Sequence, residues 1–141
     1  MKGALYVESS AVVRVTVERH TLLRSRIEAA KKLTTSTLME AEARRAIIRA
    51  ERDGRIDARH RRESEAWLRN LLGECSIVAV DEAILARAVL DFPVEPVRTL
   101  DAIHLASAIH FADLVGALTM VSCDDRVRDN AKALGWKVLP A

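Results

Sequence analysis

Short apolar runs alternate along this chain with longer segments whose apolar residues recur at helical spacing. Apolar or β-branched runs bounded by polar residues predict buried strands, and they lie at residues 4–7, 31–35, 76–80, 117–121 and 136–139. The helical spacing covers residues 22–30, 37–53, 57–72, 84–89, 99–108 and 126–134. Because the connections are long enough for crossovers, this alternation predicts a three-layer α/β/α sandwich around a mostly parallel sheet.

The second and third predicted helices form a helical hairpin. In the first of these two helices, the pattern places Leu38, Ala41 and Ile48 toward the core, with Glu42 along the edge of that buried face. In the second, we expect Asp57 to cap the helix and Gly73 to end it. The strand at residues 76–80 is expected to be buried, and Asp81 is expected to cap the helix after it. Thr99 is expected to cap the apolar helix that follows Pro93 and Pro96.

Length and composition predict a single domain over residues 1–141, since half of the 141 residues are apolar and can bury a substantial core. The apolar runs are far shorter than the roughly 18 residues of a membrane-spanning helix. Cys75 and Cys123 are isolated and lack metal-ligand spacing, which suits a reducing compartment. We therefore expect a soluble cytoplasmic protein that does not bind a membrane.

The basic residues are mostly arginine, although the formal net charge is only +2. Arg45, Arg49 and Arg52 share one ridge of the hairpin, and the charge continues across the turn at Arg55, Arg59 and Arg62. Arginine pairs with phosphate through a planar fork, which favours a nucleic-acid partner. Interleaved acids favour a solvated face held by salt bridges instead, and the pattern leaves both interpretations open.

Acidic residues stand at the ends of otherwise apolar elements. Glu8 and Asp124 follow predicted strands, and Asp101 lies in the first turn of an apolar helix. In a parallel sheet these positions converge on one crevice, and Glu42 is a candidate to join them. Clustered carboxylates repel one another unless a divalent cation is present, and Mg²⁺ or Mn²⁺ prefers carboxylate and water ligands. The sequence therefore predicts a metal site.

Four segments, taken in order, resemble the motifs of PIN-domain ribonucleases, and within them the toxins of VapBC toxin–antitoxin pairs. The segments are Leu5-Tyr6-Val7-Glu8-Ser9-Ser10-Ala11, the stretch from Ser36 to Glu42, Arg98-Thr99-Leu100-Asp101-Ala102-Ile103-His104-Leu105-Ala106, and Ser122-Cys123-Asp124-Asp125-Arg126. The spacing from Ser36 selects Glu42 over Glu40 as the matching acid.

The resemblance implies a metal-dependent endoribonuclease acting on RNA phosphodiesters, with a small antitoxin protein as partner and a homodimer as its assembly. It implies that Glu8, Glu42, Asp101 and Asp124 hold Mg²⁺ or Mn²⁺, directly or through water. Ser10 and Ser122 could orient these carboxylates. Arg98 could steer phosphate, or could form only a loop salt bridge.

One position departs from the family pattern, because Glu8 stands where the family usually has aspartate. The extra methylene moves the carboxylate by roughly 1.5 Å, and Mg²⁺ demands near-ideal octahedral geometry. A PIN-like domain with weak or no catalytic activity that binds RNA or protein is therefore the alternative. A receiver-type phosphoacceptor also gathers acids at a sheet edge, but no suitable lysine follows a late strand. We expect His104 to be a hydrogen-bonded core residue.

Overall fold

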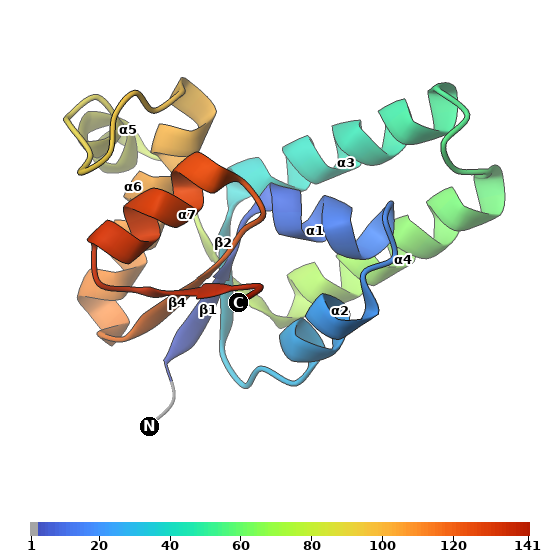
Figure 1. Ribbon diagram of the computed structural model, residues 1–141, viewed down its shortest axis with the longest axis horizontal. Helices are drawn as coiled ribbons and strands as arrows, with labels where there is room; N and C mark the ends of the chain where they lie inside the picture. Colours follow the sequence, from blue (N-terminus) through green and yellow to red (C-terminus); the bar gives the residue numbers. More distant parts are fainter. Residues whose placement is uncertain (1–2) are drawn as a thin grey trace.

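Five parallel strands form one sheet in the computed structural model, which describes residues 3–141 (Figure 1). They are β1 (Ala4–Val7), β2 (Leu33–Ser36), β3 (Cys75–Val78), β4 (Leu118–Val121) and β5 (Lys137–Leu139). Their spatial order is β3-β2-β1-β4-β5, and every neighbouring pair is parallel. Val7 pairs with Val121 where β1 and β4 end. The residues that follow these two strands therefore leave the sheet side by side.

Seven helices connect and cover the strands in the described part of the chain. They are α1 (Ser9–Thr16), α2 (Thr21–Glu28), α3 (Thr37–Arg52), α4 (Ala58–Glu74), α5 (Glu82–Ala88), α6 (Thr99–Val115) and α7 (Asp125–Ala133). α3 and α4 project together as a hairpin (Figure 1). Among residues 3–141, no helix is long and apolar enough to cross a membrane.

Side chains that alternate along the strands build two cores, one on each face of the sheet. Val7 and Val121 pack with buried residues of α1, α2, α3 and α4. Tyr6 and Met120 point to the opposite face, where they pack with α6 and α7. The predicted three-layer α/β/α sandwich is therefore confirmed, and the sheet is entirely parallel.

β3 and the adjoining helices differ from the expectations in several details. The strand predicted over residues 76–80 is β3 at the sheet edge, and it is not buried, since Ile77 is 44% exposed. Gly73 does not end α4, which continues through Glu74, although Asp57 caps it as expected. Arg98, one residue before Thr99, is the N-cap residue of α6.

The buried face of α3 is rotated from the predicted one. Its buried residues are Met39, Ala43, Ile47 and Ala50, whereas Leu38 and Ile48 are only partly buried and Ala41 is exposed. Alanines occur on several sides of this helix, so apolar spacing alone fits more than one orientation. Packing against α1 and α4 selects the observed face.

Several ion pairs lie along one side of the hairpin, within and between α3 and α4. Arg61 of α4 lies 2.7 Å from both Glu51 and Glu65, and Arg44 of α3 lies 2.8 Å from Glu40 and 3.6 Å from Glu65. These partly exposed pairs each contribute little free energy. They are compatible with the rotation of α3 that packing selects, because they lie on the side of α3 that faces α4.

Candidate metal centre

The predicted site acids come from four different elements that meet at the carboxyl edge of the sheet. Glu8 follows β1 and is the N-cap residue of α1, and Asp124 is the N-cap residue of α7 just after β4. Glu42 lies in the second turn of α3, and Asp101 lies in the first turn of α6. This convergence follows from the parallel topology, which places every strand end at the same crevice.

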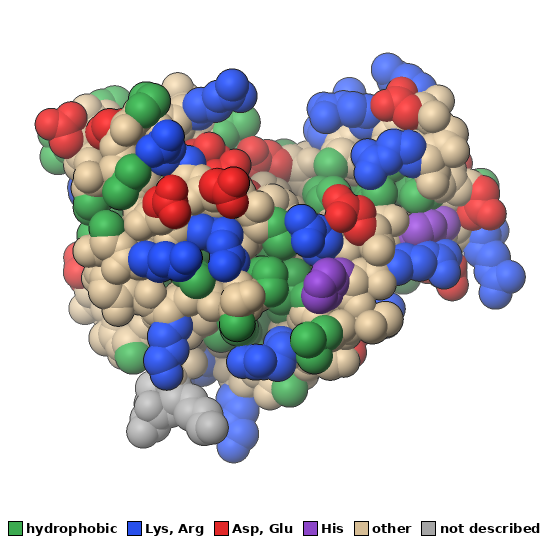
Figure 2. All heavy atoms as spheres, viewed as in Figure 1, with side chains coloured by type: hydrophobic (Ala, Val, Ile, Leu, Met, Phe, Trp, Pro, Cys, Tyr) green, Lys and Arg blue, Asp and Glu red, His purple; other side chains and the backbone are tan. Residues whose placement is uncertain are grey.

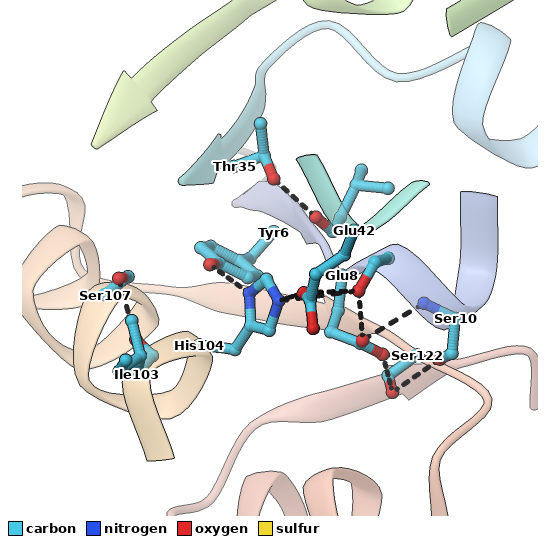
Figure 3. A network of polar contacts seen from close by, with 11 residues as sticks. Tyr6, Glu8, Ser10, Thr35, Glu42, Ile103, His104, Ser107 and Ser122 are labelled. Atoms are coloured by element: carbon cyan, nitrogen blue, oxygen red, sulfur yellow. Dashed lines mark hydrogen bonds and ion pairs between the residues drawn. The ribbon is translucent and has the colours of Figure 1, made fainter. Parts of the chain in front are cut away.

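Glu8 is buried, at 4% exposed, and donors of the chain surround its carboxylate (Figure 3). It accepts hydrogen bonds from Ser122 Oγ at 2.6 Å, from the Ser10 backbone N–H at 3.0 Å and from Ser10 Oγ. Ser9 Oγ lies 2.9 Å from its Oε2. The backbone bond makes Glu8 the cap of α1. The Glu8 side chain therefore folds back onto its own helix and also contacts Ser122, just after β4.

Ser9 is a site residue that the sequence reasoning missed. Its hydroxyl lies 2.9 Å from Glu8 and 2.8 Å from Oε1 of Glu42. A hydroxyl carries one proton and can donate to only one carboxylate at a time. Ser9 therefore relieves the repulsion between these two acids only in part.

A buried histidine contacts Glu42, and a buried tyrosine in turn contacts that histidine. His104 Nε2 lies 2.5 Å from Glu42 Oε1, and its Nδ1 lies 3.0 Å from the Tyr6 hydroxyl (Figure 3). An ionised carboxylate only accepts hydrogen bonds. We therefore assign a proton to Nε2 of His104, which makes His104 the donor in this contact. Burial raises the pKa of Tyr6, so its phenol keeps its proton. His104 is thus the hydrogen-bonded core residue that was expected, but its partner is a site acid.

Opposing effects act on the ionisation of Glu42. Burial disfavours the charged form, while the hydrogen bond and charge of His104 and the hydrogen bond from Ser9 favour it. The favourable effects outweigh burial and lower the pKa of Glu42. Glu42 is therefore a fixed, negatively charged group at the crevice.

Asp101 differs from the other acids because its carboxylate has no hydrogen-bond donor among residues 3–141. Burial, followed by the charges of Asp124 and Glu8, raises its pKa to about 6. The charge of His104 acts in the opposite sense, and Glu42 adds a further increase. Asp101 is therefore close enough to the three other acids for their charges to raise its pKa, and the charge of His104 does not offset this rise.

Asp124 caps α7, accepting from the Val127 N–H at 3.0 Å. Ser122 Oγ accepts from the Asp124 backbone N–H at 3.1 Å and donates to Glu8, so it links two site acids. Arg98 is exposed and forms no ion pair in the described part of the chain. The predicted loop salt bridge is therefore absent within residues 3–141.

The donor set suits a hard divalent cation. One oxygen each of Glu8 and Glu42 and a ring nitrogen of His104 lie within 4.8 Å of one another and could hold a metal ion. The proton assigned to Nε2 makes His104 a donor to Glu42, so we assign the oxygens as ligands. Asp101 has no donor within residues 3–141, and burial and the neighbouring carboxylates disfavour its charge, which a divalent cation would help to compensate.

Comparison with known proteins agrees with this fold. Residues 5–133 match the model of the PIN domain family. Ribonuclease VapC46 of Mycobacterium tuberculosis is 33% identical over 139 residues, which cover 97% of each chain. The chain therefore belongs to the PIN domain family, whose nucleases use divalent metal ions, and it is homologous to a ribonuclease named as a VapC protein.

Solved structures share the fold at low sequence identity. PAE2754 from Pyrobaculum aerophilum superimposes with a TM-score of 0.62 at 21% identity, covering 97% of this chain and 84% of that one. A FitAB structure bound to a DNA fragment gives 0.66 at 12% identity, covering 96% and 93%. VapBC2 from Rickettsia felis, bound to a promoter fragment, gives 0.63 at 10% identity, covering 96% of each chain.

Proposed function

We propose that this protein is a metal-dependent endoribonuclease that acts as the toxin of a toxin–antitoxin pair, folded as a single PIN domain. The observation that carries the proposal is the convergence of Glu8, Glu42, Asp101 and Asp124 on one edge, with Asp101 lacking any donor among the described residues. Membership of the PIN domain family and similarity to ribonuclease VapC46 support it.

Glu8, Glu42, Asp101 and Asp124 would hold Mg²⁺ or Mn²⁺, directly or through water. The bound ion would activate a water for attack on an RNA phosphodiester and neutralise charge that develops on the phosphate. The protein's own contribution is orientation. Ser10 and Ser122 fix the carboxylate of Glu8, and His104 fixes that of Glu42.

A cleavage assay with purified protein tests this function. We expect it to cut RNA with Mg²⁺ or Mn²⁺ and to stop in excess EDTA. Asp101→Asn should abolish cleavage, whereas Glu82→Gln, which removes a first-turn acid from α5, should leave it unchanged. Undiminished cleavage in EDTA, or full activity of Asp101→Asn, would contradict the proposal.

The second candidate is a PIN-like domain that binds RNA or protein without cutting. The donors that surround Glu8 favour it, since a carboxylate with about four acceptor positions has few left for a metal ion. RNA binding without cleavage at any divalent metal concentration would select this alternative.

The proposed partner is a small antitoxin protein, as the names of the VapBC and FitAB assemblies suggest. Co-purification with a small protein encoded by a neighbouring gene, together with loss of nuclease activity in the complex, would support this. We further propose a homodimer, which sedimentation of the purified protein tests. A cytoplasmic location suits the free thiols of Cys75 and Cys123.

A further inference from the structure

We propose that Arg45, Arg49 and Arg52 form an RNA-binding ridge on α3 that holds the phosphates of one RNA strand and leads it to the acid cluster. We call these three residues the α3 ridge. The proposal rests on the ribonuclease function above, and it adds where the substrate lies.

The α3 ridge begins at the site itself. Arg45, Arg49 and Arg52 follow Glu42 by three, seven and ten positions, a spacing that keeps them on the same side of α3 as Glu42. At about 1.5 Å per residue, they lie about 4.5, 10.5 and 15 Å along the helix from Glu42. A strand bound to them would therefore continue into the crevice that holds the acids.

The two polar sides of α3 have different surroundings. Arg44 and Glu51, on the side facing α4, are engaged in ion pairs. On the other side, Arg45, Arg49 and Arg52 are exposed, and their guanidinium groups have no ion pair or side-chain hydrogen bond within residues 3–141. The interleaved acids of the hairpin thus neutralise one side only, which leaves the α3 ridge free for an external anion.

The chemistry of the α3 ridge fits phosphate. A guanidinium group offers two parallel donors that match phosphate oxygens, and it keeps its charge at any physiological pH. Figure 2 shows basic side chains gathered over the outer part of the α3–α4 hairpin, with acidic side chains nearer the point where α3 begins. An acidic protein segment could pair with the same arginines, but the continuity of the α3 ridge with Glu42 favours the substrate.

The test measures binding of a single-stranded RNA by fluorescence anisotropy in EDTA, over a range of salt concentrations. The ridge variant replaces Arg45, Arg49 and Arg52 with glutamine, a good helix former. The control variant carries Arg26→Gln, Lys31→Gln and Lys32→Gln, which remove the same charge from exposed positions outside α3. Lys31 and Lys32 precede β2 and so lie toward the opposite edge of the sheet from the acids. Circular dichroism checks that both variants fold.

Each phosphate contact with a single strand contributes about 0.7 to the slope of log affinity against log salt. Loss of the α3 ridge should therefore lower this slope by about 2. The ratio of the wild-type RNA affinity to that of the ridge variant should then fall roughly fifteenfold between 50 and 200 mM salt. The control variant should keep most of the slope. Replacing the three arginines with lysine should preserve the slope as well, because the charge remains.

Equal losses in the ridge and control variants would show general attraction by net charge and overturn the proposal. An unchanged slope in the ridge variant would overturn it too. If the α3 ridge substitutions weakened binding of a polyglutamate peptide but not of RNA, the ridge would be a protein-binding surface instead. Because binding is measured without metal, an inactive protein that still binds RNA through the α3 ridge would refute the nuclease function and leave this inference intact.

Discussion

Replacing Asp101 with asparagine should stabilise the metal-free protein. The side chain has no hydrogen-bond donor among the described residues, so the substitution breaks no contact made by its carboxylate. It removes a negative charge that burial and the carboxylates of Asp124 and Glu8 disfavour. If Asp101 served only as a favourable first-turn acid of α6, the same substitution would destabilise the protein.

The expected gain follows from the pKa of Asp101, which rises from 3.8 to about 6 on folding. Well below pH 3.8 the carboxyl is protonated in both states and costs nothing. As the pH rises from about 4 to about 6, the unfolded chain ionises first, so stability falls; above pH 6 the penalty is constant. This rise of the pKa from 3.8 to about 6 corresponds to about 3 kcal/mol. Because Asp101 is only half-buried, screening reduces this to about 1–2 kcal/mol.

Asparagine loses the attraction between the carboxylate and the helix N-terminus, worth about 0.5 kcal/mol. The net gain at pH 7.5 is therefore about 1 kcal/mol, which raises the melting temperature of a chain this size by about 3 °C. At pH 4 most of this penalty is absent, so the wild type and the variant should differ much less in melting temperature than at pH 7.5. Adding Mn²⁺ should stabilise the wild type and have little effect on Asp101→Asn, since the ion then lacks a ligand.

Thermal unfolding in EDTA at pH 4 and 7.5 measures this difference. Glu82→Gln is the matched control, because Glu82 is a first-turn acid of α5 and lies outside the cluster. It should lower the melting temperature slightly or leave it unchanged at both pH values. A lower melting temperature for Asp101→Asn at pH 7.5 would refute the reasoning, since Asp101 would then be a structural acid of α6.

Two further substitutions test the groups that hold the site. In Glu8→Asp the side chain is too short to keep the bond to Ser122 but retains the charge, so this substitution should tighten Mg²⁺ binding and speed cleavage, whereas Glu8→Gln should weaken both. Titration calorimetry and cleavage rates measure these changes. Slower cleavage by a folded Glu8→Asp variant would show that the site is tuned to glutamate. Tyr6→Phe should lower Mn²⁺ affinity by up to about tenfold, because His104 loses the hydroxyl that helps to orient it toward Glu42. An unchanged affinity alongside reduced thermal stability would give Tyr6 a purely structural role.

The order of the strands and of six of the helices could be predicted from the sequence because apolar periodicity reports local structure directly, but α1 (Ser9–Thr16) was not among the predicted helices. The position of a strand in the sheet could not be predicted, since β3 has an apolar pattern whether it lies inside the sheet or at its edge. Its exposed Ile77 follows from the strand order, which depends on contacts between distant segments. The rotation of α3 was mispredicted for a related reason: alanines fit many sides of a helix, and only the packing partners choose among them.

The acids of the site could be identified from their places at strand and helix ends, because parallel topology brings such ends together. Their supporting contacts could not be predicted in the same way. Tyr6 reaches His104 because alternation along β1 turns it toward α6, while Ser9 lies between two carboxylates through the turn from β1 into α1. One signal was available: His104 follows Asp101 by three positions and so shares its side of the helix.

The hydrogen bonds divide the cluster into two kinds of acid, and this division indicates what a cation contributes. The carboxylates of Glu8 and Glu42 are already fixed by serines and by His104, so the protein itself stabilises their charge. Asp101 has no donor within residues 3–141, and its charge is disfavoured until something positive arrives. A divalent cation would supply to Asp101 what the serines supply to Glu8. The site would therefore be preorganised on one side and completed by the ion on the other, and the stability gained on binding the ion should depend mainly on Asp101.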